Sequence, residues 1–240
     1  MMKKVKRFFL AGLLLVGATG AWAQDEIETT VSGDVVSSYI WRGQDLGDVS
    51  LQPTLGVSYK GLSLTAWGSV GLTDPLDTKE FDLTLSYTTG GLNIGITDYW
   101  FDAGLDPDAR YFKYDAHGTN HVFEANIGYD FGVASVQWFT NFAGNDGINK
   151  DGKRAYSSYA EVVVPFKLSA IDWTATVGAV PFATSFYNDW TSGFAVTNVS
   201  LKATKDIKVT DSFSIPVFGQ IAGNPCTQKA YLVFGFTLQP

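Results

Sequence analysis

Phe81-Asp82-Leu83-Thr84-Leu85-Ser86-Tyr87 alternates large apolar residues with small polar or charged ones at every step. Successive side chains of a β-strand point to opposite faces, so this stretch predicts a strand with one apolar and one polar face. The stretches 122–129 and 229–236 repeat the pattern, with Phe, Ala, Ile and Tyr on one face of the first and Ala, Leu, Phe and Phe on one face of the second. No stretch after residue 23 keeps a helical apolar stripe for more than two turns. The alternation therefore indicates an all-β chain.

The same pattern along the chain predicts about twelve strands, with boundaries uncertain by about two to four residues. Their ranges are 27–42, 51–60, 62–72, 80–89, 91–101, 120–131, 133–143, 155–168, 171–184, 192–205, 212–222 and 226–238.

The connections between these strands alternate in length. Short turns, most of them with glycine, occupy 60–61, 89–91, 130–132 and 168–170, whereas longer segments rich in Asp, Gly, Asn and Pro occupy 43–50, 73–79, 102–119, 144–154, 185–191 and 223–225. The segment 206–211 is the exception, because it is longer than a short turn. Alternating short and long connections, an even number of strands and two belts of aromatic residues are typical of transmembrane antiparallel up-and-down β-barrels. Closing the sheet into a barrel gives every backbone N–H and C=O group within the lipid a hydrogen-bond partner on a neighbouring strand.

The N-terminal residues predict a secretory signal peptide. Lys3, Lys4, Lys6 and Arg7 precede an almost wholly apolar or small run over 8–20, and Ala21-Trp22-Ala23 has the small-x-small cleavage pattern. The run of about 13 residues is shorter than the roughly 18 to 20 that a membrane-spanning helix needs. We therefore expect cleavage after Ala23, a signal peptide over 1–23 and a single barrel domain over 24–240.

Composition excludes several classes of protein. The chain has 17 Lys and Arg against 24 Asp and Glu, a net charge of −7, so it lacks the basic stripe that nucleic acid requires. Cys226 is the only cysteine, and no intrachain disulfide can form. We expect no nucleic-acid partner and no cofactor.

One short motif carries a resemblance. Ser37-Ser38-Tyr39-Ile40-Trp41-Arg42-Gly43, followed by Gln52-Pro53 and by an alternating strand, turn and strand through Trp67-Gly68, resembles the opening of the TorF-type porin family. The resemblance implies an outer-membrane barrel with a channel function. The chain departs from the usual outer-membrane pattern at its end, because Phe236 is followed by Thr-Leu-Gln-Pro instead of closing the chain.

The polar face of the predicted strands is the candidate functional surface. Charges exposed to hydrocarbon cost a few kcal/mol, so this face is expected to line the lumen. Its residues are Asp34, Arg42, Asp82, Glu124, Asn126, Glu161, Lys202 and Lys229. The preferred interpretation is a passive channel for small polar solutes or ions, and the alternative is a plugged structural barrel whose interior charges pair with each other.

Arg42 is the sharpest single candidate in this set. Its guanidinium, near the predicted outer mouth, could narrow the pore or hold an anionic group. It could equally be a structural tie to Asp34, to Asp45 or to a strand carbonyl, and the sequence leaves the two open.

A hydrolase at the outer rim is the alternative from a different class. His117 and His121 lie in the longest predicted loop beside Asp115, and Ser157, Ser158 or Asp98 could approach them in space. Gly118 argues against a helical metal site. We assign no catalytic and no metal-binding residue, and we expect outer-membrane lipid and lipopolysaccharide as partners of the acidic outer loops.

Overall fold

A computed structural model of the chain describes residues 27–102, 106, 108–116, 118–188, 193–211 and 213–239. The predicted signal peptide and His117 lie outside the described residues. The strands are β1 (Glu28–Val36), β2 (Tyr39–Trp41), β3 (Gln44–Gly47), β4 (Ser50–Tyr59), β5 (Leu62–Gly71), β6 (Lys79–Thr89), β7 (Leu92–Asp102), β8 (His121–Asp130), β9 (Ser135–Gly144), β10 (Ser158–Leu168), β11 (Ile171–Val180), β12 (Ala195–Lys208), β13 (Ser214–Asn224) and β14 (Lys229–Leu238).

Twelve of these strands form a closed antiparallel barrel. Each of them pairs with its neighbours in chain order, except that β1 pairs with β4 because β2 and β3 form a separate two-stranded sheet. The ring closes where β14 pairs with β1, with Val35 opposite Phe236. Both the all-β class and the twelve-stranded barrel are confirmed.

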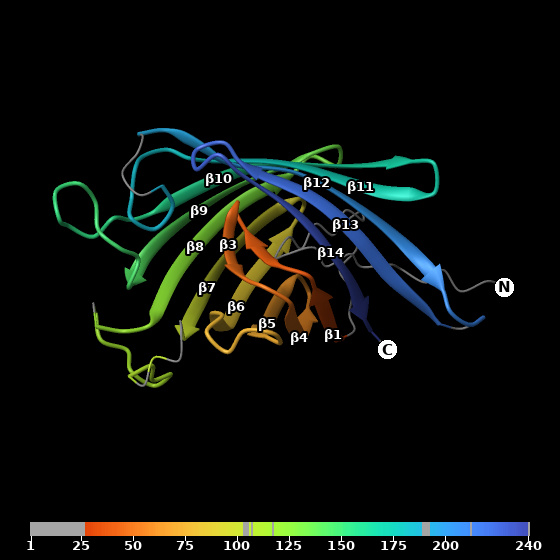
Figure 1. The fold of residues 1–240 in the computed structure, drawn as a ribbon, viewed down its shortest axis with the longest axis horizontal. Helices are drawn as coiled ribbons and strands as arrows, with labels where there is room; N and C mark the ends of the chain where they lie inside the picture. The colour runs from red at the N-terminus through yellow and green to blue at the C-terminus, as the bar shows by residue number, and fades with distance from the viewer. Residues whose placement is uncertain are drawn as a thin grey trace.

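The connections are sorted between the two ends of the barrel (Figure 1). The turns 60–61, 90–91, 131–134, 169–170 and 209–213 lie at one end, where β1 begins and β14 ends, and the connections 72–78, 103–120, 145–157 and 181–194 lie at the other. The predicted exception at 206–211 is smaller than expected, because β12 continues to Lys208. The connection 225–228 is only as long as the turn 131–134 of the opposite end.

The two faces of the wall differ as the alternation predicts. In β6, Asp82 and Thr84 point inward and are 1% and 7% exposed, whereas Leu85 points outward and is 52% exposed. Ile127 in β8 is likewise outward and exposed, while Glu124 on the same strand is buried. The barrel therefore has an apolar exterior and a polar interior.

The first predicted strand is wrong in its second half. β1 ends at Val36, and 37–49 leave the wall to form the hairpin of β2 and β3, which lies in front of the far strands within the barrel in Figure 1. Ser37 is the point of departure: its backbone N–H donates to Phe234 O at 2.8 Å, and its Oγ accepts from Phe234 N at 2.9 Å. The residues predicted as an outer loop over 43–50 are therefore mostly the turn and second strand of this hairpin. The alternation of Tyr39-Ile40-Trp41 predicts a strand correctly but cannot indicate which sheet the strand joins.

The described part of the chain contains no helix with the length and apolar character to span a bilayer.

Close packing inside the barrel generates the first prediction. A Cβ on Gly178 would lie 1.8 Å from the Tyr159 hydroxyl oxygen, and Tyr159 is fully buried. Gly178→Ala is expected to lower the free energy of unfolding by about 1 to 3 kcal/mol, because Tyr159 must leave its position. Gly219→Ala is the matched control in the same sheet, since its nearest neighbours would lie 3.6 Å away. Urea unfolding followed by tryptophan fluorescence measures both, and equal midpoints would contradict the packing described.

Candidate functional site

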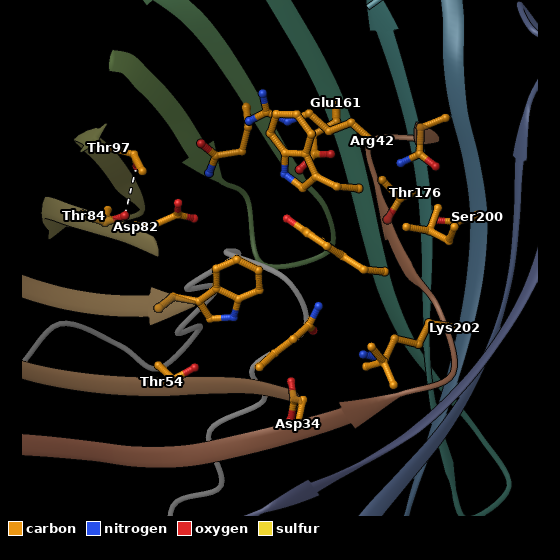
Figure 2. Close-up of a pocket in the computed structure, with 18 of the residues that line it drawn as sticks. Asp34, Arg42, Thr54, Asp82, Thr84, Thr97, Glu161, Thr176, Ser200 and Lys202 are labelled. Carbon is orange, nitrogen blue, oxygen red and sulfur yellow. Dashed lines mark hydrogen bonds between the residues drawn. The ribbon is translucent and has the colours of Figure 1, made fainter. Parts of the chain in front are cut away.

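The lumen holds a cavity of about 280 Å³ beneath the hairpin. Tyr39 and Arg42 of the hairpin form part of its lining, and hydroxyl, amide and charged side chains of the surrounding strands form the rest. Figure 2 shows Asp82, Thr84 and Thr97 on one side of this space and Thr176, Ser200 and Lys202 on the other. The cavity is the candidate functional site because it brings together the polar inward face of most strands.

The structure places most of the predicted lumen residues at this cavity. Those that line it are Asp34, Arg42, Asp82, Asn126, Glu161 and Lys202. Glu124 is buried directly behind Arg42 and bonded to it. Lys229 starts β14 at the long-loop end, where it is exposed, and it does not line the cavity.

Arg42 lies in the turn of the hairpin, at φ 51°. Its Nη1 and Nη2 donate to Glu124 Oε2 and Oε1 at 2.5 and 2.9 Å, a two-point ion pair. Nη1 also donates to the Tyr187 hydroxyl oxygen at 2.5 Å. The side chains of Arg42 and Glu124 are 7% and 2% exposed. The hairpin is thus tied to β8 across the inside of the barrel.

Aromatic rings surround the same guanidinium. Its carbon lies 4.3, 4.1 and 4.7 Å from the ring centroids of Trp41, Phe139 and Tyr159. Cation–π contacts of this kind strengthen when water is excluded. Of the two interpretations of Arg42, the structural tie fits this geometry. Its partner is Glu124, and not Asp34, Asp45 or a strand carbonyl.

Hydrogen bonds and a close backbone contact at Gly43 hold the rest of the hairpin in place. The Tyr39 hydroxyl donates to Glu80 Oε2 at 2.8 Å, and Asn224 Nδ2 donates to Gly43 O at 3.1 Å. Gly43 has φ 79°, and a Cβ there would lie 1.8 Å from the Thr197 carbonyl oxygen. Glycine is therefore required at this turn, both for its backbone conformation and for its close approach to β12.

An aromatic cluster packs inside the barrel next to the cavity, and two of its members, Trp41 and Phe139, line that cavity. Trp41 stacks on Tyr187 with centroids 6.1 Å apart and meets Tyr99 at 5.8 Å. Tyr187 lies in the segment 181–188 after β11 and is buried against Arg42, and burial raises the pKa of its hydroxyl above the usual value. The hydroxyl therefore stays protonated, and its oxygen accepts the hydrogen bond from Arg42. The cluster consists of Trp41, Phe139, Tyr159, Val180, Phe186, Tyr187, Ala195 and Cys226.

Sequence reasoning missed three residues of this arrangement. Glu80 lies two positions before Asp82 on the same face of β6, so the alternation itself could have found it. Tyr99, whose hydroxyl donates to Glu124 Oε1 at 2.8 Å, lies on the inward face of β7 and was not among the predicted lumen residues. Tyr187 belongs to a connection, where no periodic pattern indicates an inward direction.

His121 lies away from the lumen, on the outward face of β8. Its Nδ1 is 2.7 Å from Asp98 Oδ1, and its Nε2 is 2.5 Å from Tyr111 O. Of the residues that the sequence analysis named as able to approach the histidines, Asp98 lies beside His121. Ser157 and Ser158 bond elsewhere, to Asp146 O at 3.0 Å and to Tyr156 O at 2.9 Å. Among the described residues, no group of three or more His, Cys, Asp or Glu side chains is arranged to hold a metal ion.

No protein-family model matches the chain, and no curated protein matches it in sequence.

The ion pair between Arg42 and Glu124 predicts how the hairpin is protected. Glu124→Gln leaves Arg42 without its carboxylate, and breaking a buried pair in this way costs about 3 to 5 kcal/mol. We expect trypsin to cut after Arg42 in folded Glu124→Gln but not in the wild type, with fragments identified by mass spectrometry. Asp172→Asn is the control, because Asp172 pairs with Lys167 at 3.0 Å and is 37% exposed. Cleavage at equal rates in all three proteins would show that the ion pair does not hold the hairpin.

Proposed function

We propose that the chain is an outer-membrane β-barrel of the TorF type that acts as a narrow passive channel for small polar solutes or ions, with hairpin β2–β3 closing the path in this conformation. The observation that carries the proposal is a closed sheet that exposes apolar side chains outward around its ring and gathers polar ones within.

The exterior supports a lipid environment. Leu55, Leu85, Ile127, Ile221 and Leu232, on strands spread around the ring, are each more than half exposed. Soluble monomers rarely expose continuous apolar surface on this scale, because the surface is costly to hydrate. Hydrocarbon removes that cost, and the closed backbone ladder leaves no unpaired edge within it.

The interior supports a path for polar solutes. The cavity is lined largely by Thr, Ser, Asn and Gln side chains. Buried and half-buried acidic side chains within the described part of the lumen outnumber the basic ones, with Asp34, Glu80, Asp82, Glu124 and Glu161 against Arg42 and Lys202. Fixed charge of one sign in a pore sets ion preference, so this interior favours cations over anions. Conduction requires the hairpin to move, because Arg42 and the aromatic cluster pack inside the barrel next to the cavity.

A plugged scaffold barrel is the second candidate, and the aromatic cluster is the observation that favours it. Side chains pack there at 4.9 to 6.2 Å between ring centroids, as in the interior of a soluble protein. In that case the hairpin is a permanent part of the fold, and the barrel passes nothing.

Single-channel recording separates these functions. In a planar bilayer we expect rare openings of the wild type and an open fraction at least about tenfold higher for Arg42→Ala, because loss of as little as 1.4 kcal/mol from the closed state changes the equilibrium tenfold. Under a salt gradient the reversal potential should report a preference for cations.

Lys208→Ala is the control, since Lys208 is exposed and pairs with Asp211 near the short turns. Both proteins must first be shown to be folded by circular dichroism and by heat-modifiable gel mobility. If neither the folded wild type nor folded Arg42→Ala then gives conductance steps, the channel proposal is contradicted and the scaffold is favoured.

A second experiment tests the membrane environment. Leu85→Lys places a charge at the middle of the outward face of β6. It should destabilise the barrel folded in lipid by about 2 to 4 kcal/mol. Ser86→Lys, one residue along and inward, should cost much less because its ammonium enters the polar lumen. Folded fractions in phospholipid vesicles under urea measure both, and equal losses would argue against a lipid-facing exterior.

A further inference from the structure

Asp82 is a buried side chain of the lumen wall, and one of its two carboxyl oxygens lacks a hydrogen bond. It is 1% exposed and lines the cavity; its carboxyl group is hydrogen-bonded to Glu80, whereas its Oδ1 has no hydrogen-bond partner among the described residues. Figure 2 shows its carboxylate directed into the open space. A carboxylate oxygen removed from water without a partner is costly, so a group that supplies a positive charge there would be stabilised.

The neighbours of Asp82 in the wall are aromatic on both sides. Trp67 of β5 and Tyr99 of β7 are its direct cross-strand partners, so the three side chains form one row on the inward face. Trp67 and Tyr99 also line the cavity. A carboxylate between aromatic rings is the arrangement that binds organic ammonium groups, because the ring faces attract the cation while the carboxylate accepts its N–H bonds.

The bases of the lumen are placed elsewhere. Arg42 is engaged by Glu124 and Tyr187. Lys202 projects from β12, which lies six strands from β6 in the ring of twelve, and its Nζ lies 3.7 Å from the centroid of the Phe218 ring. The carboxylate row on β6 therefore faces the cavity without a base of its own at Asp82 Oδ1.

We propose that this cavity is a binding site for a small organic cation with a protonated amine, which Asp82 Oδ1 accepts and the Trp67 and Tyr99 rings flank. The inference rests on the proposed function, since it names the class of solute that the same lumen would take. The volume of about 280 Å³ limits that solute to a small molecule.

The lumen already contains one cation held in this way. The guanidinium of Arg42 is bound by a buried carboxylate and lies 4.1 to 4.7 Å from three ring centroids. The same wall chemistry thus holds a cation when the chain itself supplies it. At Asp82 Oδ1 the described residues supply no such cation, and the residue lines the cavity.

Equilibrium binding to the full mature protein in uncharged detergent micelles tests the site without requiring conduction. The probes are n-butylammonium, 1-butanol and butyrate, which share a chain and differ in charge. Isothermal titration calorimetry should show saturable binding of n-butylammonium only. Asp82→Asn keeps the shape of the side chain and should weaken that binding at least about tenfold, because the charge that favours the ammonium is gone. Asp172→Asn, at the short-turn end, should leave it unchanged.

The outcomes separate this site from the channel. Binding of n-butylammonium by a barrel that never conducts would support the site and contradict the channel, whereas conduction without any such binding would do the reverse. Equal binding of n-butylammonium and 1-butanol, or an unchanged affinity in Asp82→Asn, would overturn the site. Absence of n-butylammonium binding in folded wild type would also overturn the site. If Asp82→Asn fails to fold, the three-probe comparison on the wild type, with Trp67→Leu as the second variant expected to weaken binding, decides the question.

Discussion

Closure of the sheet is the constraint on which everything else in this barrel depends, because each backbone N–H and C=O of a wall strand needs a partner from a neighbouring strand. The seam between β1 and β14 is the shortest part of that ladder: four residue pairs join them, from Gly33 with Leu238 to Val36 with Gly235, against a register of nine pairs between β1 and β4. The seam is short because the chain leaves the wall after Val36 to build the hairpin. Ser37 limits the loss by bonding Phe234 through both its N–H and its hydroxyl. The plug and the closure of the barrel are therefore built from the same few residues.

The hairpin in turn depends on a buried ion pair, and the energetics of such pairs explain why it can be both well seated and movable. Removing Arg42 and Glu124 from water is expensive, and their two-point contact together with the Tyr99 and Tyr187 hydroxyls offsets most of that cost. The net stabilisation of a complete pair is small even though the loss from breaking half of it is large. A hairpin held in this way has a specific geometry at a small net gain in free energy, and the proposed channel would need such a balance in order to open at equilibrium.

The alternation of apolar and polar residues predicted most of the wall strands correctly. It gave a wrong prediction where the chain leaves the wall after Val36. The stretch Phe81 to Tyr87, whose apolar face points outward and whose polar face points into the lumen, was placed in the correct strand and orientation. The segment Tyr39-Ile40-Trp41 has the same period of two, but its surroundings are the inside of the barrel, and no local pattern distinguishes a wall strand from a strand of a plug. The partner of Arg42 was missed for a related reason, since Glu124 lies 82 residues away and is brought near only by closure. What alternation could predict was the direction of a side chain within the wall, and not which of the inward side chains would meet.

The carboxylates on β6 and β8 link the hairpin to whatever enters the cavity beneath it. Glu124 forms an ion pair with Arg42, whereas Asp82 Oδ1 has no hydrogen-bond partner among the described residues. Glu80, near Asp82, accepts a hydrogen bond from Tyr39 of the same hairpin. A cation beside Asp82 would weaken the negative field in which Arg42 sits, because charges in a space with little water interact over several ångströms. Coupling of this kind is reciprocal: a cation that loosens the hairpin is bound more tightly once the hairpin has moved. If the barrel opens as proposed, the position of Asp82 near a hairpin that is anchored by Glu124 would couple occupancy of the cavity to opening.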